Sequence, residues 1–366
     1  MITLIIGYRN RDLIRVKKSL DSLAFQNKND FELIFIDYGS DLNIASTIKD
    51  LVYSYPFAKY IYVDTRGMFW NRAHALNIGV SYAKSEILVF LDVDLILEQH
   101  FLEKISKLSY NEFYYTFSCF YLPENFDYAS DIFKNGIHYE QNYVGLCALN
   151  KSTFLNSGGF DEYYMIWGVE DDDLYKKLTI EGFKRVELGF PEFTIYHQFH
   201  QIESPKKPDL WYLTMINHFY DKQLDLKSIS HFNFLSDRPA RNVFEDGNYK
   251  KNIKLILNKN RTILMYNKFI SDFYELRSNQ ISWFEYEIKN DNYLSPKIKS
   301  FIYSVFKSIF LISSSNKAYY SKTIHEPTFL EVNSFIAYFI GTHRRMISDY
   351  YLNMTAKNIS LVIIKK

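Results

Sequence analysis

The feature that most constrains the fold is an alternation, along the first half of the chain, of short β-branched or aromatic runs with longer amphipathic stretches. This alternation is typical of a mostly parallel sheet whose strands are connected by crossover helices. The predicted strands are 2–6, 31–36, 60–63 and 87–91, and the predicted helices are 12–25, capped by Asp12, and 71–83. The first half of the chain therefore predicts an α/β domain.

Polar clusters follow three of the predicted strands, at residues 7–11, 37–41 and 92–94. In open α/β sheets, ligands bind in the crevice beyond the carboxyl ends of the strands. We therefore expect these three clusters to converge on one crevice.

The charge balance of the chain excludes some partners. Among its 366 residues, 43 Lys and Arg face 42 Asp and Glu, which leaves a net charge of +1. No global field would attract nucleic acid or an anionic membrane, so a site for an anionic ligand must be local. The 31 Tyr and 31 Phe raise the aromatic fraction to 18%, which is too high for a disordered chain.

Cysteine usage and the apolar runs bear on the compartment. Cys119 and Cys147 cannot make a disulfide framework or a thiolate zinc site. The longest apolar runs are the length of strands, and the N-terminus shows no signal peptide. We expect a cytoplasmic protein, and peripheral attachment to the inner face of the cell membrane is left open.

The character of the sequence changes after Pro205, where glycines become rare and aromatic residues, Lys and Asn become frequent. We predict a first domain at 1–240 and a smaller, mainly helical C-terminal domain of unknown role at 241–366. The longest helices expected there are 296–312 and 330–352. Within the first of these, basic and aromatic residues alternate; a helix packed in a core is the favoured interpretation, and a helix lying on a membrane is the alternative.

Asp92 and Asp94 come directly after a predicted strand. Residues two apart on an extended backbone point to the same side, so this pair offers two hard oxygen ligands suited to Mn²⁺ or Mg²⁺ with a diphosphate as co-ligand. A bare Asp-x-Asp is more often a solvated turn, but its place at a strand end favours a metal. His197 and His200 follow a predicted strand at 193–196, and either could be a further ligand.

Four consecutive acids, 170–173, follow Trp167 and Gly168. Adjacent carboxylates raise one another's pKa, so such a run favours a catalytic base, a ligand contact or a helix N-terminus. The acids would complement the dipole of a helix predicted at 174–181, but this does not explain the Trp-Gly pair before them.

Arginines supply the cations that a diphosphate would need. Arg9 and Arg11 follow the first strand, and Arg72 opens the predicted helix 71–83. The alternative for each is an ordinary surface arginine.

Five ordered motifs run through residues 1–205. They are IIGYRNR at 5–11, FWNRAHALNIG at 69–79, VFLDVDLI at 89–96, GLCALNK at 145–151, and GF followed by WGVEDDD within 159–173. Together they resemble the β-1,4-galactosyltransferase family and the first transferase module of bacterial chondroitin polymerases, which are family 2 glycosyltransferases. The resemblance implies a GT-A fold, which is a Rossmann-like domain with a mostly parallel central sheet.

The resemblance also implies an activity. It is a metal-dependent, inverting transfer of Gal, GalNAc or GlcNAc from a UDP-sugar to a hydroxyl of a glycan or lipid-linked oligosaccharide, in the synthesis of a bacterial surface polysaccharide. The implied roles are Mn²⁺ (or Mg²⁺) binding by Asp94 and His197; nucleotide-sugar binding by Tyr8, Arg9, Arg11, Asp37, Arg72, Asp92 and Glu170; acceptor binding by Trp167, Gly168 and Asp172; and general-base catalysis by Asp171.

Departures from the family pattern limit these implications. Asp37 and Tyr38 replace a pair of acids of which one reads the nucleobase. Asn142 stands where galactosyltransferases carry a Tyr that narrows the pocket beside C2 of the sugar, so N-acetylated donors compete with UDP-galactose. A catalytically silent carbohydrate-binding or scaffolding subunit is the alternative function, against which the joint presence of the metal-site residues and the base argues.

Overall fold

The computed structural model describes residues 1–124, 126–127, 140–200, 210–221, 238–246, 254–256, 269–271, 273–278, 281–287, 329–355 and 358–366. The chain divides into two compact units. The first comprises Met1–Pro208 and Tyr212–Asn233, and the second comprises Asp209–Trp211 and Phe234–Lys366. Each unit is described by itself.

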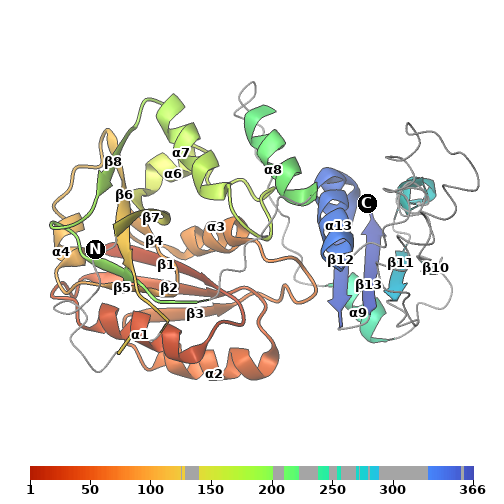
Figure 1. Ribbon diagram of the computed structural model, residues 1–366, viewed down its shortest axis with the longest axis horizontal. Coiled ribbons are helices and arrows are strands. Elements are labelled where there is room, and N and C mark those ends of the chain that lie inside the picture. The colour runs from red at the N-terminus through yellow and green to blue at the C-terminus, as the bar shows by residue number, and fades with distance from the viewer. Residues whose placement is uncertain are drawn as a thin grey trace, which may run out of the picture. The chain divides into compact units, whose positions relative to one another are not determined.

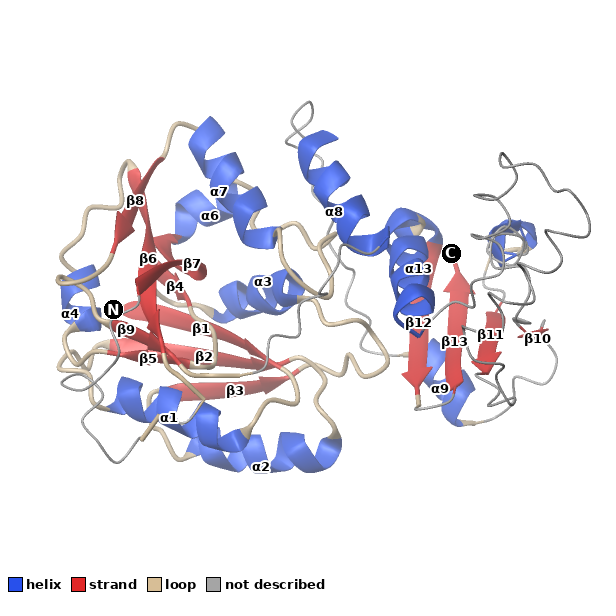
Figure 2. Ribbon diagram, in the orientation of Figure 1, coloured by secondary structure: helices blue, strands red, loops and turns tan. Residues whose placement is uncertain are grey.

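The first unit is built on one large mixed sheet (Figures 1 and 2). Its strands are β1 (Ile2–Tyr8), β2 (Phe31–Asp37), β3 (Ala58–Tyr62), β4 (Ile87–Phe90), β5 (Leu95–Leu97), β6 (Phe113–Tyr121), β7 (Glu140–Asn150), β8 (Lys184–Leu188) and β9 (Ile195–His197). The strand order is β3-β2-β1-β4-β7-β6-β9-β5, and β8 pairs with β6. The pairs among β1 to β4 are parallel, which confirms the Rossmann-like, mostly parallel sheet.

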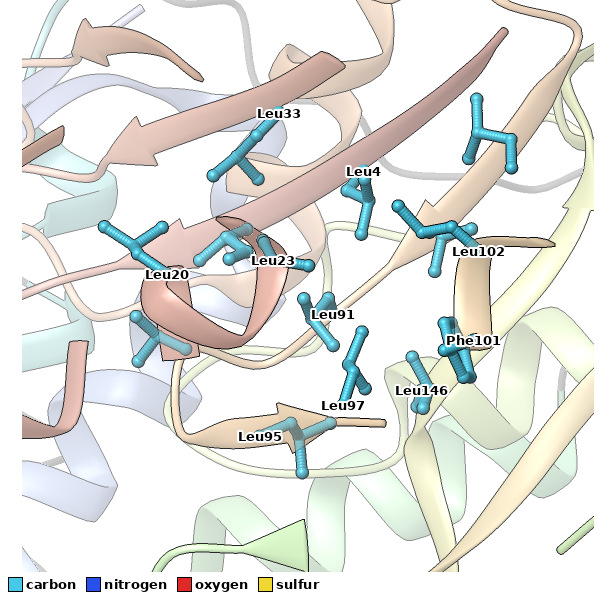
Figure 3. Packing of buried hydrophobic residues seen from close by; sticks show 14 of the residues in the cluster. Leu4, Leu20, Leu23, Leu33, Leu91, Leu95, Leu97, Phe101, Leu102 and Leu146 are labelled. Carbon is cyan, nitrogen blue, oxygen red and sulfur yellow. The ribbon is translucent and has the colours of Figure 1, made fainter. Parts of the chain in front are cut away.

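Helices cover both faces of this sheet. They are α1 (Leu13–Ala24), α2 (Leu42–Tyr53), α3 (Arg72–Tyr82), α4 (Phe101–Ile105), α6 (Lys151–Asn156) and α7 (Glu170–Ile180), and α8 (Leu210–Asp221) follows. One core joins α1, α2 and α4 to one face of the sheet, and Figure 3 shows Leu20 and Leu23 of α1 in it beside Leu4 and Leu33. A second core joins α3, α6 and α7 to the opposite face.

Local sequence explains where helices α1 and α3 begin. Asp12 caps α1, because its side chain accepts a hydrogen bond from the backbone N–H of Arg15 at 2.9 Å. Asn71 caps α3 in the same way through His74. A Cβ at Gly79 would lie 2.3 Å from Ile5, so glycine is what allows α3 to approach β1 this closely. These caps confirm the helices predicted at 12–25 and 71–83.

The prediction for the acidic run needs a correction. A helix was expected to begin at Leu174 after an acidic turn, but α7 begins at Glu170, so the four acids form its first turn. The residue before the helix, Val169, has a φ of 75°, a left-handed conformation that is rare for a β-branched side chain. The sharp reversal at this residue lets the helix start early.

The second unit holds α9 (Pro239–Glu245) and α13 (Phe329–Thr342) beside a four-stranded sheet. The strands are β10 (Lys254–Ile256), β11 (Ile281–Glu287), β12 (Ile347–Met354) and β13 (Asn358–Lys365), in the order β10-β11-β13-β12. A buried ion pair joins Arg238 Nε to Asp349 Oδ1 at 2.9 Å.

The described part of this unit is therefore less helical than the sequence predicted. The helix expected at 330–352 ends at Thr342, and the chain re-enters as β12 at Ile347. Antiparallel pairing with β13 stabilises the run from Ile347 to Met354 as a strand, with a register irregularity between Ile347 and Asp349. The helix predicted at 296–312 lies outside the described residues.

Two further observations complete the fold. Cys119 and Cys147 are both buried and free. Among the described residues, no helix combines the length and the apolar character that a crossing of the bilayer would require.

Candidate active site

The parallel strands bring the predicted polar clusters to one edge of the sheet. β1, β2 and β4 run in the same direction, so the residues after each of them lie at the same edge. The chain leaves β4 at Phe90, passes through Asp92 and Asp94, and enters β5.

Asp94 lies against two histidines. β5 pairs antiparallel with β9, with Leu95 opposite His197, and the backbone N–H of Gln198 donates to the Asp94 carbonyl at 3.0 Å. Oδ1 of Asp94 lies 3.7 Å from Nε2 of His197, and Oδ2 of Asp94 lies 3.3 Å from Nε2 of His200. The sheet register therefore brings together residues about a hundred positions apart in the chain.

The donor set of Asp94, His197 and His200 fits a divalent cation. One ligand atom from each residue lies within 4.8 Å of the others. A carboxylate oxygen with two imidazole nitrogens suits Mn²⁺ better than Mg²⁺, which prefers oxygen ligands throughout. Burial lowers the pKa of His197, which favours the neutral imidazole that can ligate a metal. The sequence left His197 and His200 as alternatives, and the structure places both at Asp94.

Arg72 lies at the centre of a neighbouring cluster of three acids, Asp92, Glu170 and Asp171. Its Nε donates to Asp92 at 2.9 Å, one terminal nitrogen donates to Asp171 at 2.9 Å and lies 3.6 Å from Glu170, and the other donates to the Gly145 carbonyl at 2.7 Å. Three carboxylates thus lie close to one guanidinium. The cluster has an excess of negative charge that a cation could offset.

Asp171 is the most perturbed acid of this cluster. Burial raises its pKa to about 8, with a further contribution from the negative charge of Glu170, and Arg72 opposes both. Burial also raises the pKa values of Glu170 and Asp172. A carboxylate with a pKa near neutrality is suited to accept a proton during a reaction.

Two asparagines of α3 hold the segment that precedes α7. Asn71 Nδ2 donates to the Glu162 carbonyl at 2.7 Å. Asn77 exchanges hydrogen bonds with the backbone of Phe160 and donates to the Glu162 carboxylate at 2.8 Å. No role was predicted for these two asparagines from the sequence. Their shared helix with Arg72 is the signal that could have shown one, because that helix positions both the arginine and the acidic segment.

The binding residues expected after β1 and β2 are largely used by the chain itself. Arg9 donates to the carbonyls of Tyr38 at 2.5 Å, Met68 at 2.8 Å and Thr65 at 3.0 Å, and to the Thr65 hydroxyl at 2.6 Å. These bonds tie three loops together. The diphosphate contact that the resemblance implies for Arg9 stays a prediction.

Tyr8 and Asp37 are buried core residues. Tyr8 packs on Phe35, and its hydroxyl donates to the Arg11 carbonyl at 2.8 Å. Asp37 is fully buried and accepts bonds from the Ser40 N–H and the Tyr60 hydroxyl. Burial raises the pKa of both groups. Neither side chain is exposed in this structure, and their contacts with a nucleoside stay predictions.

The loop before α7 presents Trp167 to solvent. Half of this side chain is exposed, and its ring centroid lies 6.3 Å from that of Tyr212 on α8. Ile166, Gly168 and Val169 all have positive φ, and a Cβ on Gly168 would meet nothing within 4 Å. The loop therefore holds strained backbone next to open space, as binding loops often do.

Comparisons with known proteins identify the class of domain to which this part of the chain is similar. Residues 3–133 match the model of glycosyl transferase family 2, and residues 124–219 match the model described as the N-terminal domain of galactosyltransferase. The chain carries a family 2 glycosyltransferase domain. The glycosyltransferase resemblance expected from the five motifs is confirmed.

Curated relatives point to the same class of enzyme. The chain is 34% identical over 128 residues to β-1,4-galactosyltransferase 1 of Bos taurus, covering 34% of this chain and 28% of that protein. It is 26% identical over 215 residues to chondroitin sulfate synthase 3 of Homo sapiens, covering 54% and 24%. The chain thus spans less than a third of either relative. A solved structure of S. aureus TarS superposes with a TM-score of 0.44 and 14% identity, covering 61% of this chain and 40% of that one.

Proposed function

We propose that this chain is a metal-dependent, inverting glycosyltransferase that moves a hexose or N-acetylhexosamine from a UDP-sugar to a hydroxyl of a glycan. The observation that carries the proposal is the meeting, at one sheet edge, of the Asp94–His197–His200 donor set and the Arg72–Asp171 cluster. A cation site beside a buried carboxylate of raised pKa is what such a transfer needs.

Asp94, His197 and His200 would hold Mn²⁺, and the bound ion would neutralise the charge that develops on the departing diphosphate. Arg72 would add a second positive charge on the same side. Asp92, which Arg72 orients, would face the nucleotide. Arg11 would contribute to diphosphate binding at the end of β1.

Asp171 would act as the general base. The acceptor hydroxyl oxygen attacks the anomeric carbon, its proton passes to the Asp171 carboxylate, and the bond between the anomeric carbon and the diphosphate oxygen breaks, so that UDP leaves. Attack on the face opposite the leaving group inverts the anomeric configuration. Glu170 and Asp172 would orient donor and acceptor, and Trp167 with Gly168 would cover the acceptor sugar.

The identity of donor and acceptor rests on the relatives and on the motif resemblance. The relatives' names concern galactosyl transfer and chondroitin sulfate synthesis, which supports UDP-galactose as a donor to test. Asn142, in the place of a Tyr in the family pattern, adds UDP-GalNAc and UDP-GlcNAc. The resemblance to bacterial polymerases supports a surface polysaccharide, built on a glycan or a lipid-linked oligosaccharide. The transferase domain would extend over 1–240. The membrane contact considered for 297–310 concerns residues outside the described part of the chain.

The test is turnover with matched variants. Purified protein with Mn²⁺ and each UDP-sugar should release UDP in the presence of an acceptor, and Asp171→Asn should lower this rate by about 10² to 10⁴ while donor binding persists. Glu181→Gln is the control, because Glu181 follows the last turn of the same helix and is exposed.

Two results would overturn the proposal. Full activity of Asp171→Asn would remove the base assignment. If calorimetry detected no Mn²⁺-dependent binding of UDP to the wild-type protein, the alternative of a silent scaffolding subunit would replace a transferase.

A further inference from the structure

The outer face of α1 carries an unusual pair of side chains. Among the described residues, the two most exposed large apolar side chains are Phe25, at 73%, and Ile14, at 63%. Phe25 is the C-cap residue directly after α1 and stands eleven positions after Ile14, about three helical turns, so both face the same side. Leu13, 40% exposed, adjoins Ile14.

Basic residues surround this apolar pair. Lys17 and Lys18 lie on the same side of the helix, one turn after Leu13 and Ile14. Residues 11–28 contain five basic and two acidic side chains, although the whole chain is nearly neutral. Asp12 caps α1, and Asp21, two turns after Ile14 on the same side of the helix, accepts hydrogen bonds from Lys17 and from the Tyr55 hydroxyl.

The opposite face of α1 accounts for its place in the fold. Val16, Leu20 and Leu23 are buried in the core beneath the sheet. Packing therefore explains the inner face, whereas burial within the first unit explains neither Ile14 nor Phe25. Scattered exposed apolar residues are normal on a protein surface, but two such exposed residues on one basic helix face are typical of an interfacial helix.

We propose that the outer face of α1, comprising Leu13, Ile14, Lys17, Lys18 and Phe25, binds the surface of an anionic lipid bilayer. The helix lies parallel to the membrane, with the apolar side chains among the acyl chains and Lys18 at the anionic headgroups, while Lys17 stays paired with Asp21. This attachment is independent of the proposed transferase activity and of the C-terminal segment.

The attachment would place the candidate active site near the lipid surface. Gln198 Nε2 donates to the carbonyl of Arg15 at 2.9 Å, which joins the N-terminal turn of α1 to the segment between the two metal-site histidines. The Ile14 end of the face is therefore next to the site. An acceptor carried on a membrane lipid would be within reach there.

The experiment is flotation of the full chain with vesicles, in the absence of any substrate. Vesicles of phosphatidylcholine mixed with phosphatidylglycerol should bind the wild-type protein, and high salt should release it. Pure phosphatidylcholine should bind it weakly. The double variant Ile14→Ser with Phe25→Ser should lower the partition coefficient at least about tenfold, because both apolar anchors are lost. Lys18→Glu should lower it at least about fivefold.

The control pair is Leu155→Ser with Ile180→Ser. These side chains are 55% and 54% exposed, and they lie on or beside α6 and α7, on the other side of the sheet (Figure 2). Their loss should leave vesicle binding unchanged, and thermal unfolding should be alike in all variants.

Three results would overturn the proposal. They are no binding of wild type to anionic vesicles, equal binding by the Ile14/Phe25 variant, and equal loss in the control pair. If light scattering instead showed a dimer that only the Ile14/Phe25 variant abolished, the face would be an interface between copies. Because no substrate is present, a negative result here leaves the turnover test unaffected, and the reverse holds.

Discussion

The carboxyl edge of the sheet has two sides that use their charged residues differently. On the side of β1 and β2, the polar groups of Arg9 and Asp37 bond to backbone and to neighbouring hydroxyls. On the side of β4 and α7, carboxylates gather around the side chain of Arg72. The first arrangement is the kind that holds loops in place. The second leaves a surplus of negative charge, which costs stability unless a cationic ligand uses it.

The largest effect should come from the charged side. Arg72→Met removes the cation that faces Asp92, Glu170 and Asp171, and we expect turnover to fall by about 10³, in line with the loss of a preorganised electrostatic contact. UDP release with the best UDP-sugar measures this. Arg72→Lys keeps the charge but cannot make all three bonds, so it should recover part of the rate. If Arg72→Met were as active as wild type, the two sides of this sheet edge would not differ in function.

Stability should depend on pH through Asp171. Its pKa in the folded protein, about 8, lies above its ordinary value of 3.8, so the folded state prefers the protonated acid. The free energy of unfolding should therefore fall as pH rises through this window and level off above it. Asp171→Asn lacks this loss, so its stability relative to wild type should increase with pH.

Denaturant unfolding of the metal-free protein at several pH values within that window measures the difference. Parallel pH profiles for wild type and Asp171→Asn would contradict the raised pKa of Asp171 in the folded protein.

On the side of β1 and β2, loss of a charged side chain should mainly lower the free energy of unfolding. Arg9→Met removes one donor from each of three backbone carbonyls, and we expect the free energy of unfolding to fall by about 3 kcal/mol. The Tyr38 carbonyl keeps the Thr65 hydroxyl and the Thr65 carbonyl keeps the Met68 N–H, so the Met68 carbonyl bears most of this loss. Mn²⁺ affinity should stay unchanged. Arg66→Met is the matched control: Arg66 pairs with Asp64 at a partly exposed position, and its loss should cost about 1 kcal/mol or less. Unchanged stability with weaker donor binding would instead favour the diphosphate role for Arg9.

The sequence predicted the sheet and its charged edge well because both depend on local patterns. Apolar runs with strand period and the caps Asp12 and Asn71 are visible in short windows. It did not predict the hydrogen bonds that Arg9 and Asp37 make within the chain, because a motif shows which residue stands at a strand end and not which loop backbone lies beside it. The helix expected through 352 failed for a similar reason, since pairing with β13 decides the state of Ile347–Met354.

A smaller effect should separate the two histidines. Asp94 lies nearer to His200 than to His197, and His200 is the more exposed of the two. His200→Gln should weaken Mn²⁺ binding by about tenfold, since the remaining ligands and an amide oxygen can still hold the ion. His197→Gln, at the more buried position, should weaken it further. Calorimetric titration with Mn²⁺ measures both, and equal affinity for wild type and His200→Gln would leave His197 as the histidine ligand.

The smallest expected effect concerns Tyr8, and it tests whether this residue, like Arg9 and Asp37, serves mainly to stabilise the fold. Tyr8→Phe keeps the ring against Phe35 and deletes the bond to the Arg11 carbonyl, so the free energy of unfolding should fall by about 1 kcal/mol. Tyr60→Phe should cost more, because its hydroxyl bonds both Asp37 and the Ala45 carbonyl. Neither change should alter KM for the donor. A raised KM in Tyr8→Phe alone would mean that binding of the nucleotide exposes this tyrosine. The contrast between the Arg9–Asp37 side and the Arg72 side of the sheet edge would then hold only for the free protein.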